Sequence, residues 1–164
     1  MSEHESVPLS LAEYLPYRLA VLSGRIGRSG ARLYRKYFGF GQREWRVMAV
    51  LGESGELPLS RLAEFASIDS GTATRALAAL VRLKLVNRRP DETDARKVLF
   101  LLSESGRDCY DTIARNARVR EEFLLTALTA RERAAFDRLL AKLEAKAPEL
   151  DALDPFVSDD SSQP

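Results

Sequence analysis

Residues 69–83 read DSGTATRALAALVRL, and this stretch has the clearest helical pattern in the chain. Asp69 or Ser70 can cap a helix at its N-terminus. An apolar stripe follows at the spacing of one helix face and consists of Ala73, Ala76, Leu77, Leu80 and Leu83. At about 100° per residue, the opposite side holds Gly71, Arg75, Ala78 and Arg82, with Thr72, Thr74 and Ala79 beside them. The pattern predicts a helix with one buried side and one small, polar and basic side.

The polar side of this helix has the composition that a DNA major groove admits. Small residues let a backbone approach the groove closely, hydroxyl groups can donate to phosphates or base edges, and an arginine can bind guanine through two parallel hydrogen bonds. For Thr72 and Thr74, helix capping or solvent exposure is the alternative explanation. Gly71 costs a helix about 1 kcal/mol relative to alanine, which a close approach to DNA would explain.

A β-hairpin is expected directly after this helix. Residues 86–89 and 97–102 have the composition of strands, and the turn between them, residues 90–96, reads PDETDAR. Residues 82–97 carry six basic and three acidic groups, which gives this short segment a net charge of +3. The hairpin therefore carries charge at its tip.

Helical spacing recurs before and after this unit. It predicts a long first helix over residues 16–37, a short second helix that ends at Gly52 and Gly55, and a third helix over residues 60–66. Ser103 can cap a fifth helix, and a capping box at residues 129–132 starts a sixth helix that ends near Pro148. The fold class is mainly α with a small β-hairpin, a winged helix-turn-helix with six helices, in which the second helix of the turn reads DNA.

Length and composition set the domain organisation. The chain has 164 residues and 45% apolar residues, enough for one compact domain. We expect an N-terminal arm at residues 1–15, a single domain at residues 16–146 whose DNA-binding lobe spans about 42–102, and an acidic, disordered tail at residues 147–164. The longest apolar run, residues 76–81, is too short to span a bilayer, which needs about 20 residues.

The sequence has few of the side chains that usually bind metals or act in catalysis. Cys109 is the only cysteine and His4 the only histidine, so a structural zinc site would lack ligands and a histidine-based hydrolase would lack a positioned base. We expect no cofactor and no enzymatic activity. The lone thiol and the absence of a secretion signal favour a cytoplasmic location.

The charge is unevenly distributed, although the formal net charge is only +1. Residues 17–46 carry eight basic groups and one acid, a net charge of +7. Residues 148–164 carry five acids and no basic group. Nucleic-acid binders can show such a local field under a neutral total, whereas the alternative for the first basic run is a solvated helix face.

Several motifs resemble the MarR-type transcriptional regulators (multiple antibiotic resistance regulators) over roughly residues 10–146. Leu62-Ala63-Glu64, residues 70–77 and residues 80–83 resemble the paired helices of that family, and Leu85-Val86-Asn87-Arg88-Arg89 resembles its run into the wing. The most specific match is DETDARK at residues 91–97, followed by LSESG at residues 102–106, which is similar to the D-x-R wing of the family and its exit into the next helix.

The resemblance implies a set of DNA contacts. Arg96 would enter the minor groove from the wing tip while Asp94 orients it, since a narrow minor groove concentrates negative potential. An ordinary surface ion pair, worth about 0 to 1 kcal/mol, is the alternative. The candidate DNA-binding residues are Ser70, Gly71, Thr72, Thr74, Arg75, Arg82, Asp94, Arg96 and Lys97.

The resemblance also implies a homodimer joined through the first and last helices, bound to a pseudo-palindromic operator with half-sites about 10 to 10.5 bp apart. It further implies a repressor released by a small aromatic or phenolic ligand. Residues that could line the ligand site are Tyr17, Arg18, Ser23, Arg25, Trp45 and Arg46. Alternatively, the aromatic residues belong to the core and the arginines to the surface or the dimer contact.

Two other classes of function remain open at this level. The first is a winged-helix module that binds a protein partner and no specific DNA sequence, whose binding would depend little on salt. The second is an enzyme that uses carboxylates alone, which would require two buried acids facing each other across a pocket.

Overall fold

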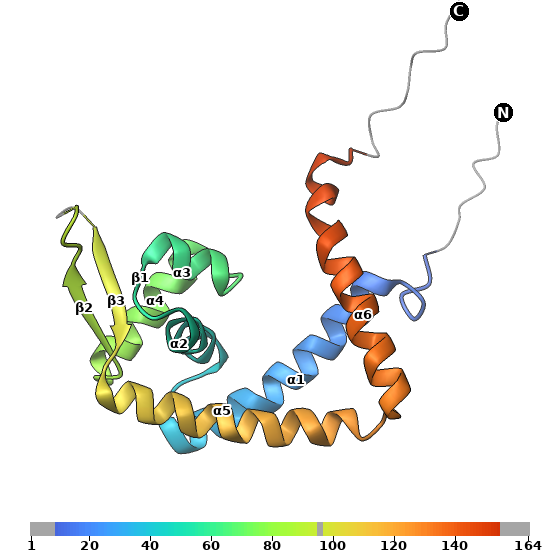
Figure 1. Ribbon diagram of the computed structural model, residues 1–164, viewed down its shortest axis with the longest axis horizontal. Coiled ribbons are helices and arrows are strands. Elements are labelled where there is room, and N and C mark those ends of the chain that lie inside the picture. The colour runs from blue at the N-terminus through green and yellow to red at the C-terminus, as the bar shows by residue number, and fades with distance from the viewer. Residues whose placement is uncertain (1–8, 95–96, 155–164) are drawn as a thin grey trace, which may run out of the picture. The chain divides into compact units, whose positions relative to one another are not determined.

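The structure, a computed structural model, describes residues 9–94 and 97–154. In this part of the chain it contains six α-helices, three short strands and one 3₁₀ helix (Figure 1). They are α1 (Leu15–Phe38), α2 (Gln42–Ser54), β1 (Leu57–Pro58), α3 (Leu59–Phe65), α4 (Ser70–Arg82), β2 (Val86–Pro90), β3 (Val98–Leu102), α5 (Glu104–Leu125), α6 (Ala130–Lys146) and η1 (Ala147–Ala152). The predicted fold class, a mainly α winged helix-turn-helix with six helices, is confirmed.

The chain divides into two compact units, residues 1–114 and 115–164, and helix α5 runs through the boundary. The first unit holds α1 and the winged lobe, by which we mean the described part of residues 42–102. The second unit holds the end of α5, then α6 and η1. No helix in either described stretch combines the length and the apolar composition that crossing a bilayer requires.

The core of the first unit lies where α2, α4 and the sheet meet. Met48 and Leu51 from α2, Leu80 from α4 and Val86 from β2 are almost completely buried in one cluster. Ile113 of α5 and Tyr34 of α1 join the same cluster, so both long helices are anchored on the lobe. This packing holds α4 by one side and leaves its other side to solvent.

The wing is a three-stranded antiparallel sheet with the order β1-β3-β2. Val86 pairs with Leu102 and Pro90 with Val98, so the predicted hairpin is correct. Strand β1, in which Leu57 pairs with Phe100 and Pro58 with Leu99, was not expected from the sequence. Two residues, one of them proline, give no alternating pattern, and the pairing itself is what makes them a strand.

Capping fixes the predicted helix starts. The Asp69 carboxylate accepts a hydrogen bond of 2.8 Å from the Thr72 backbone N–H and begins α4. A capping box at Thr129 begins α6, where Thr129 and Glu132 each accept from the other's backbone. The start of α2 is held by Glu44, whose carboxylate accepts from the Gly41 N–H at 2.8 Å.

The C-terminal segment differs from the expectation. We predicted a disordered tail from residue 147, but residues Ala147–Ala152 continue from α6 as the 3₁₀ helix η1. Pro148 occupies a first-turn position, where its missing N–H costs nothing, and Lys146 forms an ion pair with Glu149. The rest of the predicted tail, residues 155–164, lies outside the described residues.

Candidate nucleic-acid interface

Helix α4 has the two sides that its sequence predicts. Ala73, Ala76, Leu77 and Leu80 are all at least 98% buried. The opposite residues, Gly71, Arg75, Ala78 and Arg82, are all exposed. Leu83 departs from the predicted stripe: it is the C-cap rather than a helical residue and is 40% exposed. We call the surface of Gly71, Arg75, Ala78 and Arg82 the α4 face.

Short hydrogen bonds organise the first turns of α4. The Thr74 hydroxyl donates to the Ser70 carbonyl at 2.8 Å, and the Arg75 guanidinium donates from Nη2 to the Thr72 hydroxyl at 3.0 Å. Hydrogen bonds from the side chain and backbone of Thr72 lower the pKa of Asp69, so this cap stays ionised at neutral pH. Thr72 therefore joins the helix cap to the α4 face. Helix capping, the alternative explanation given for Thr72 from the sequence, is part of this role.

Gly71 lies close to both partners of Thr72. A Cβ atom added there would lie 3.2 Å from the Asp69 carboxylate and 3.5 Å from an Arg75 guanidinium nitrogen. The first of these distances is tighter than most real Cβ contacts. A glycine at this position therefore leaves the cap and the arginine undisturbed, while it keeps the backbone accessible from outside.

The wing tip is organised by its acidic residues. The Asp91 carboxylate accepts from the backbone N–H and the hydroxyl of Thr93, both at 2.7 Å, and these bonds lower the pKa of Asp91. The Lys97 ammonium lies 3.5 Å from the Asp94 carboxylate, and the Lys97 N–H donates to the Asp94 carbonyl at 2.8 Å. Arg96, the residue predicted to enter the minor groove, lies outside the described residues.

An ion pair that was not expected from the sequence connects strand β2 to the loop before β1. Arg89 of β2 donates from Nε and Nη2 to both carboxylate oxygens of Glu56, at 2.9 and 2.6 Å. The same guanidinium lies 3.3 Å from Glu92 in the wing turn. The Glu56 hydrogen bonds raise the pKa of Arg89. Glu56 and Arg89 are 33 positions apart, so only the folded sheet, with β1 and β2 on either side of β3, brings them together.

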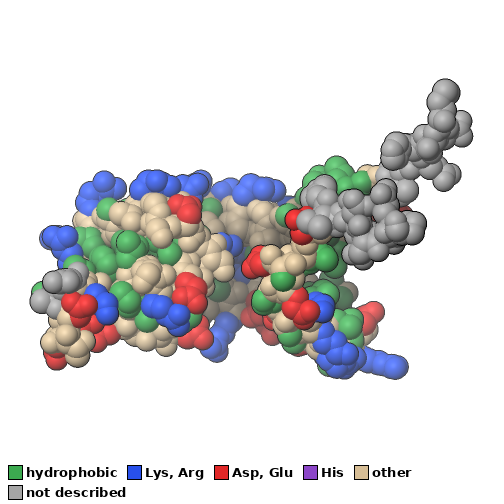
Figure 2. Space-filling model, turned by 90° about the horizontal axis from the view of Figure 1, so that it is seen from above, with side chains coloured by type: hydrophobic (Ala, Val, Ile, Leu, Met, Phe, Trp, Pro, Cys, Tyr) green, Lys and Arg blue, Asp and Glu red, His purple; other side chains and the backbone are tan. Residues whose placement is uncertain are grey.

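Positive charge is unbalanced on the winged lobe. In Figure 2, Lys and Arg side chains gather along the upper edge of the left part of the molecule, where the winged lobe lies. Within the described residues, the lobe's cations Arg75, Arg82, Lys84 and Arg88 form no ion pair. Such a surface attracts a polyanion, because these side chains carry positive charge and form no ion pair in the described chain.

The structure gives the surroundings of each of the six candidate ligand-binding residues. Tyr17, Arg18, Ser23 and Arg25 are exposed on α1. Trp45 packs with its ring centroid 5.6 Å from that of Tyr34 and stacks on Tyr110 at 5.9 Å, and it belongs to the core packing. Arg46 lines a depression of the winged lobe.

Buried reactive groups are scarce. No charged or polar residue among those described is buried, so this part of the chain holds no facing pair of buried acids. Partial burial raises the pKa of the Cys109 thiol to about 11, which keeps it protonated at neutral pH. The thiol behaves as a small apolar group packed against the core.

Comparison with known proteins gives consistent matches. Residues 41–98 match the model of the MarR family. The transcriptional repressor NicR of Pseudomonas putida is 31% identical over 97 residues, which make up 59% of this chain and 61% of NicR. The chain thus matches less than two thirds of that relative's length.

Solved structures share the fold over most of the chain. A MarR family regulator from Silicibacter pomeroyi is 29% identical, with a TM-score of 0.71 over 84% of this chain and 92% of that one. The MepR–DNA complex of S. aureus is 19% identical, with a TM-score of 0.73 over 82% of this chain and 98% of that one, a likeness of fold alone. The family model, the relative from Pseudomonas putida and the solved structures agree with the motifs in the sequence, and residues 41–98 are similar to the MarR family.

Proposed function

We propose that this protein is a sequence-specific regulator that binds double-stranded DNA through helix α4 and the wing. One observation carries the proposal: the exposed side of α4 consists of a glycine, an alanine and two arginines without ion pairs in the described chain, while its other side is fully buried. A helix anchored in this way can insert its small, basic side into a major groove without losing its own packing.

The roles of the individual residues follow from their chemistry. Arg75 and Arg82 are placed to bind guanine edges or phosphates, and Ser70 to donate to a phosphate near the start of the helix, where the Thr74 hydroxyl donates to the Ser70 carbonyl. Arg96 would follow the minor groove from the wing, with Asp94 and Lys97 at its base. MepR, which shares the fold and was solved in complex with DNA, supports DNA binding by a protein of this fold.

The functional unit in this proposal is a homodimer. Leu15, Leu19, Leu22 and Ile26 follow one another along one side of α1, and each is 41–46% exposed. In the second unit, Phe123, Leu124, Phe136, Leu139 and Leu143 are also at least 44% exposed. Apolar surface of this extent on α1, α5 and α6 favours a partner, and a second copy would supply the two-fold symmetry that a palindromic operator requires.

Regulation by a small aromatic or phenolic effector, with repression as the resting state, belongs to the same proposal and is supported only by family resemblance. An effector that favours a different lobe spacing would weaken DNA binding by as much as its affinity differs between the two states. A thermal-shift screen of aromatic acids and phenols, followed by DNA binding with each hit, tests this part. A set of hits that stabilise the protein and leave DNA affinity unchanged would contradict it.

The experiment that tests DNA binding is a gel shift with the DNA upstream of the protein's own gene. Arg96→Ala is expected to weaken binding at least tenfold. Arg75→Ala is expected to have a similar effect, because one bidentate base contact provides about 1–3 kcal/mol. Arg131→Ala on α6 serves as the charge-matched control, since it removes the same charge outside the winged lobe.

Two results would count against this proposal. Unchanged affinity in Arg75→Ala and Arg96→Ala would remove both proposed reading elements. Binding of a protein partner with little dependence on salt, and no binding to DNA, would instead favour the winged-helix protein-interaction module.

A further inference from the structure

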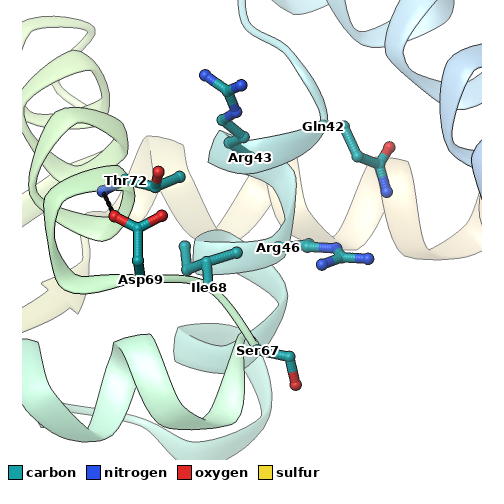
Figure 3. A pocket seen from close by; sticks show the side chains of 7 residues that line it. All are labelled: Gln42, Arg43, Arg46, Ser67, Ile68, Asp69 and Thr72. Atoms are coloured by element: carbon teal, nitrogen blue, oxygen red, sulfur yellow. Dashed lines mark hydrogen bonds between the residues drawn. The ribbon is translucent and has the colours of Figure 1, made fainter.

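A depression of about 500 Å³ opens on the winged lobe beside the α4 face (Figure 3). Its walls come from the first turns of α2, which contribute Arg43 and Arg46, from Ser67, Ile68 and Asp69 between α3 and α4, and from Thr72 of α4. In the close-up, the two arginines extend from α2 on one side, while Asp69 and Thr72 lie together at the start of α4. Neither arginine belongs to the α4 face or to the wing.

The depression is positively charged. Arg43 and Arg46 form no ion pair within residues 9–94 and 97–154. The single acid in the lining, Asp69, already accepts the Thr72 N–H and serves as the cap of α4. The lining therefore holds two guanidinium groups and one carboxylate that is engaged elsewhere, and the site favours an anion.

The lining suits a phosphate better than an aromatic acid. Ile68 is the only large apolar residue in it, and the depression is open to solvent. Sites for small organic ligands enclose most of the ligand and are lined mainly by apolar and aromatic side chains. A phosphate group needs no such enclosure, because it is held by charge and by hydrogen bonds from guanidinium and hydroxyl groups. Ser67 supplies a hydroxyl group at the rim, whereas the Thr72 hydroxyl is already engaged with Asp69 and Arg75.

The depression is continuous with the α4 face through one side chain. Thr72 lines it, and the Thr72 hydroxyl accepts the hydrogen bond from Arg75 at 3.0 Å. A helix that lies in a major groove about 12 Å wide has a phosphate backbone along each side. A duplex that engages Arg75 would therefore carry one of its backbones over the depression.

We infer that this depression binds a backbone phosphate of the DNA that α4 engages, with Arg43 and Arg46 as its ligands. The inference rests on the proposed function and extends it to α2. It moves Arg46 from the predicted effector site to the DNA interface. Because phosphate contacts fix the position of a protein on DNA and carry no base information, both arginines add affinity for every sequence alike.

The test compares Arg43→Gln/Arg46→Gln with Arg131→Gln/Arg138→Gln, a control on α6 that removes the same charge. Binding to a duplex of mixed sequence, about three helical turns long, is followed by anisotropy between about 50 and 200 mM salt. The slope of log K against log salt is expected to fall by about 0.9 for each phosphate that is no longer neutralised, so by about 1.8 in the first variant for a dimer with one such phosphate per protomer. The control is expected to keep the wild-type slope.

The outcomes are distinguishable. A wild-type protein that binds no duplex overturns the proposed function and this inference together. A wild-type protein that binds DNA, with equal slopes in both variants, overturns the inference alone.

Sodium phosphate and sodium benzoate are titrated in parallel, with the fluorescence of Trp45, the only tryptophan, as the signal. Saturable binding of either free anion that requires the two arginines, without a change in the DNA slope, assigns the site to a small ligand and overturns the DNA assignment. Circular dichroism and thermal unfolding verify that each variant is folded.

Discussion

At the scale of single residues, Gly106 is a position where only glycine fits. It lies in the first turn of α5, and a Cβ atom added there would be 1.9 Å from the carbonyl oxygen of Leu85. The Ser103 hydroxyl accepts the Gly106 N–H at 3.0 Å and donates to the Lys84 carbonyl at 2.7 Å. This close approach ties the start of α5 to the segment between α4 and β2.

Gly106→Ala is therefore expected to reduce the free energy of unfolding by about 1–3 kcal/mol or more, since backbone atoms must move apart. Urea unfolding followed by circular dichroism measures the change. Gly24→Ala is the comparison, because a Cβ there meets only the flexible guanidinium end of Arg28 at 3.1 Å. Equal stability of Gly106→Ala and the wild type would contradict the packing described for α5.

Cys109 provides a second prediction at this scale. Partial burial raises the pKa of its thiol to about 11, and the thiolate is the reactive form. At pH 8, iodoacetamide is expected to react with the native protein roughly 100-fold more slowly than with an unfolded thiol of pKa about 8.5. The rate should rise as pH increases toward 11, so long as the fold persists. A reaction rate that levels off below pH 9 would show a reactive thiol instead.

Residue patterns predicted much of α4 and little of what surrounds it. The positions of Asp69, Ala73, Leu77 and Leu80 follow from capping and a 3.6-residue period, which are local rules. The close approach of Gly106 to Leu85 results from packing between distant segments, and no local sequence pattern around Gly106 predicts it. The same holds for Arg43, which appeared only as one charge in a basic run until the fold placed it beside residues 67–72.

At the scale of elements, the wing depends on an ion pair with the loop before β1. Arg89 binds Glu56 through two hydrogen bonds and approaches Glu92 in the turn, so the direction of the wing is tied to the loop between α2 and β1. Both partners are partly exposed, so the pair serves to position the wing and adds little to overall stability.

The variant Glu56→Gln distinguishes the effect of the wing position on DNA binding from the effect of one acidic charge. Removing an acid from a DNA-binding surface strengthens binding by general electrostatics, whereas losing the wing position weakens it. We expect weaker binding, about three- to tenfold, and only the smaller loss due to the removal of one cation when Arg89→Gln is added. Anisotropy at constant salt measures both variants. Glu64→Gln, which removes an acid paired only with Arg61 one turn away on α3, is the control. Tighter binding by Glu56→Gln would refute the positioning role.

Elements were predicted in proportion to their length. Each α-helix was expected from its periodicity and caps, and the hairpin from two strand-like runs around a polar turn. The strand β1 and the helix η1 were not, because two and six residues hold too little pattern for a local rule. The role assigned to Arg96 stays a prediction, since that residue lies outside the described part of the wing.

At the scale of the whole molecule, the exposed apolar residues of α1 predict self-association. Leu22→Glu/Ile26→Glu places two charges in that surface, and its mass in analytical ultracentrifugation is expected to be 18.3 kDa, against twice that value for the wild type. Ser23→Glu, at an exposed polar position on the same helix, is expected to remain a dimer. Equal masses for the wild type and the double variant would contradict the proposed interface.

The central claim is that α4 and the wing of a symmetric pair recognise a DNA sequence. Selection from a pool of random duplexes tests it most directly, because the operator need not be identified beforehand. We predict enrichment of a pseudo-palindrome whose half-sites are about one helical turn apart, and loss of that enrichment in Arg75→Ala. A pool that remains random after repeated selection with the wild-type protein would contradict the claim.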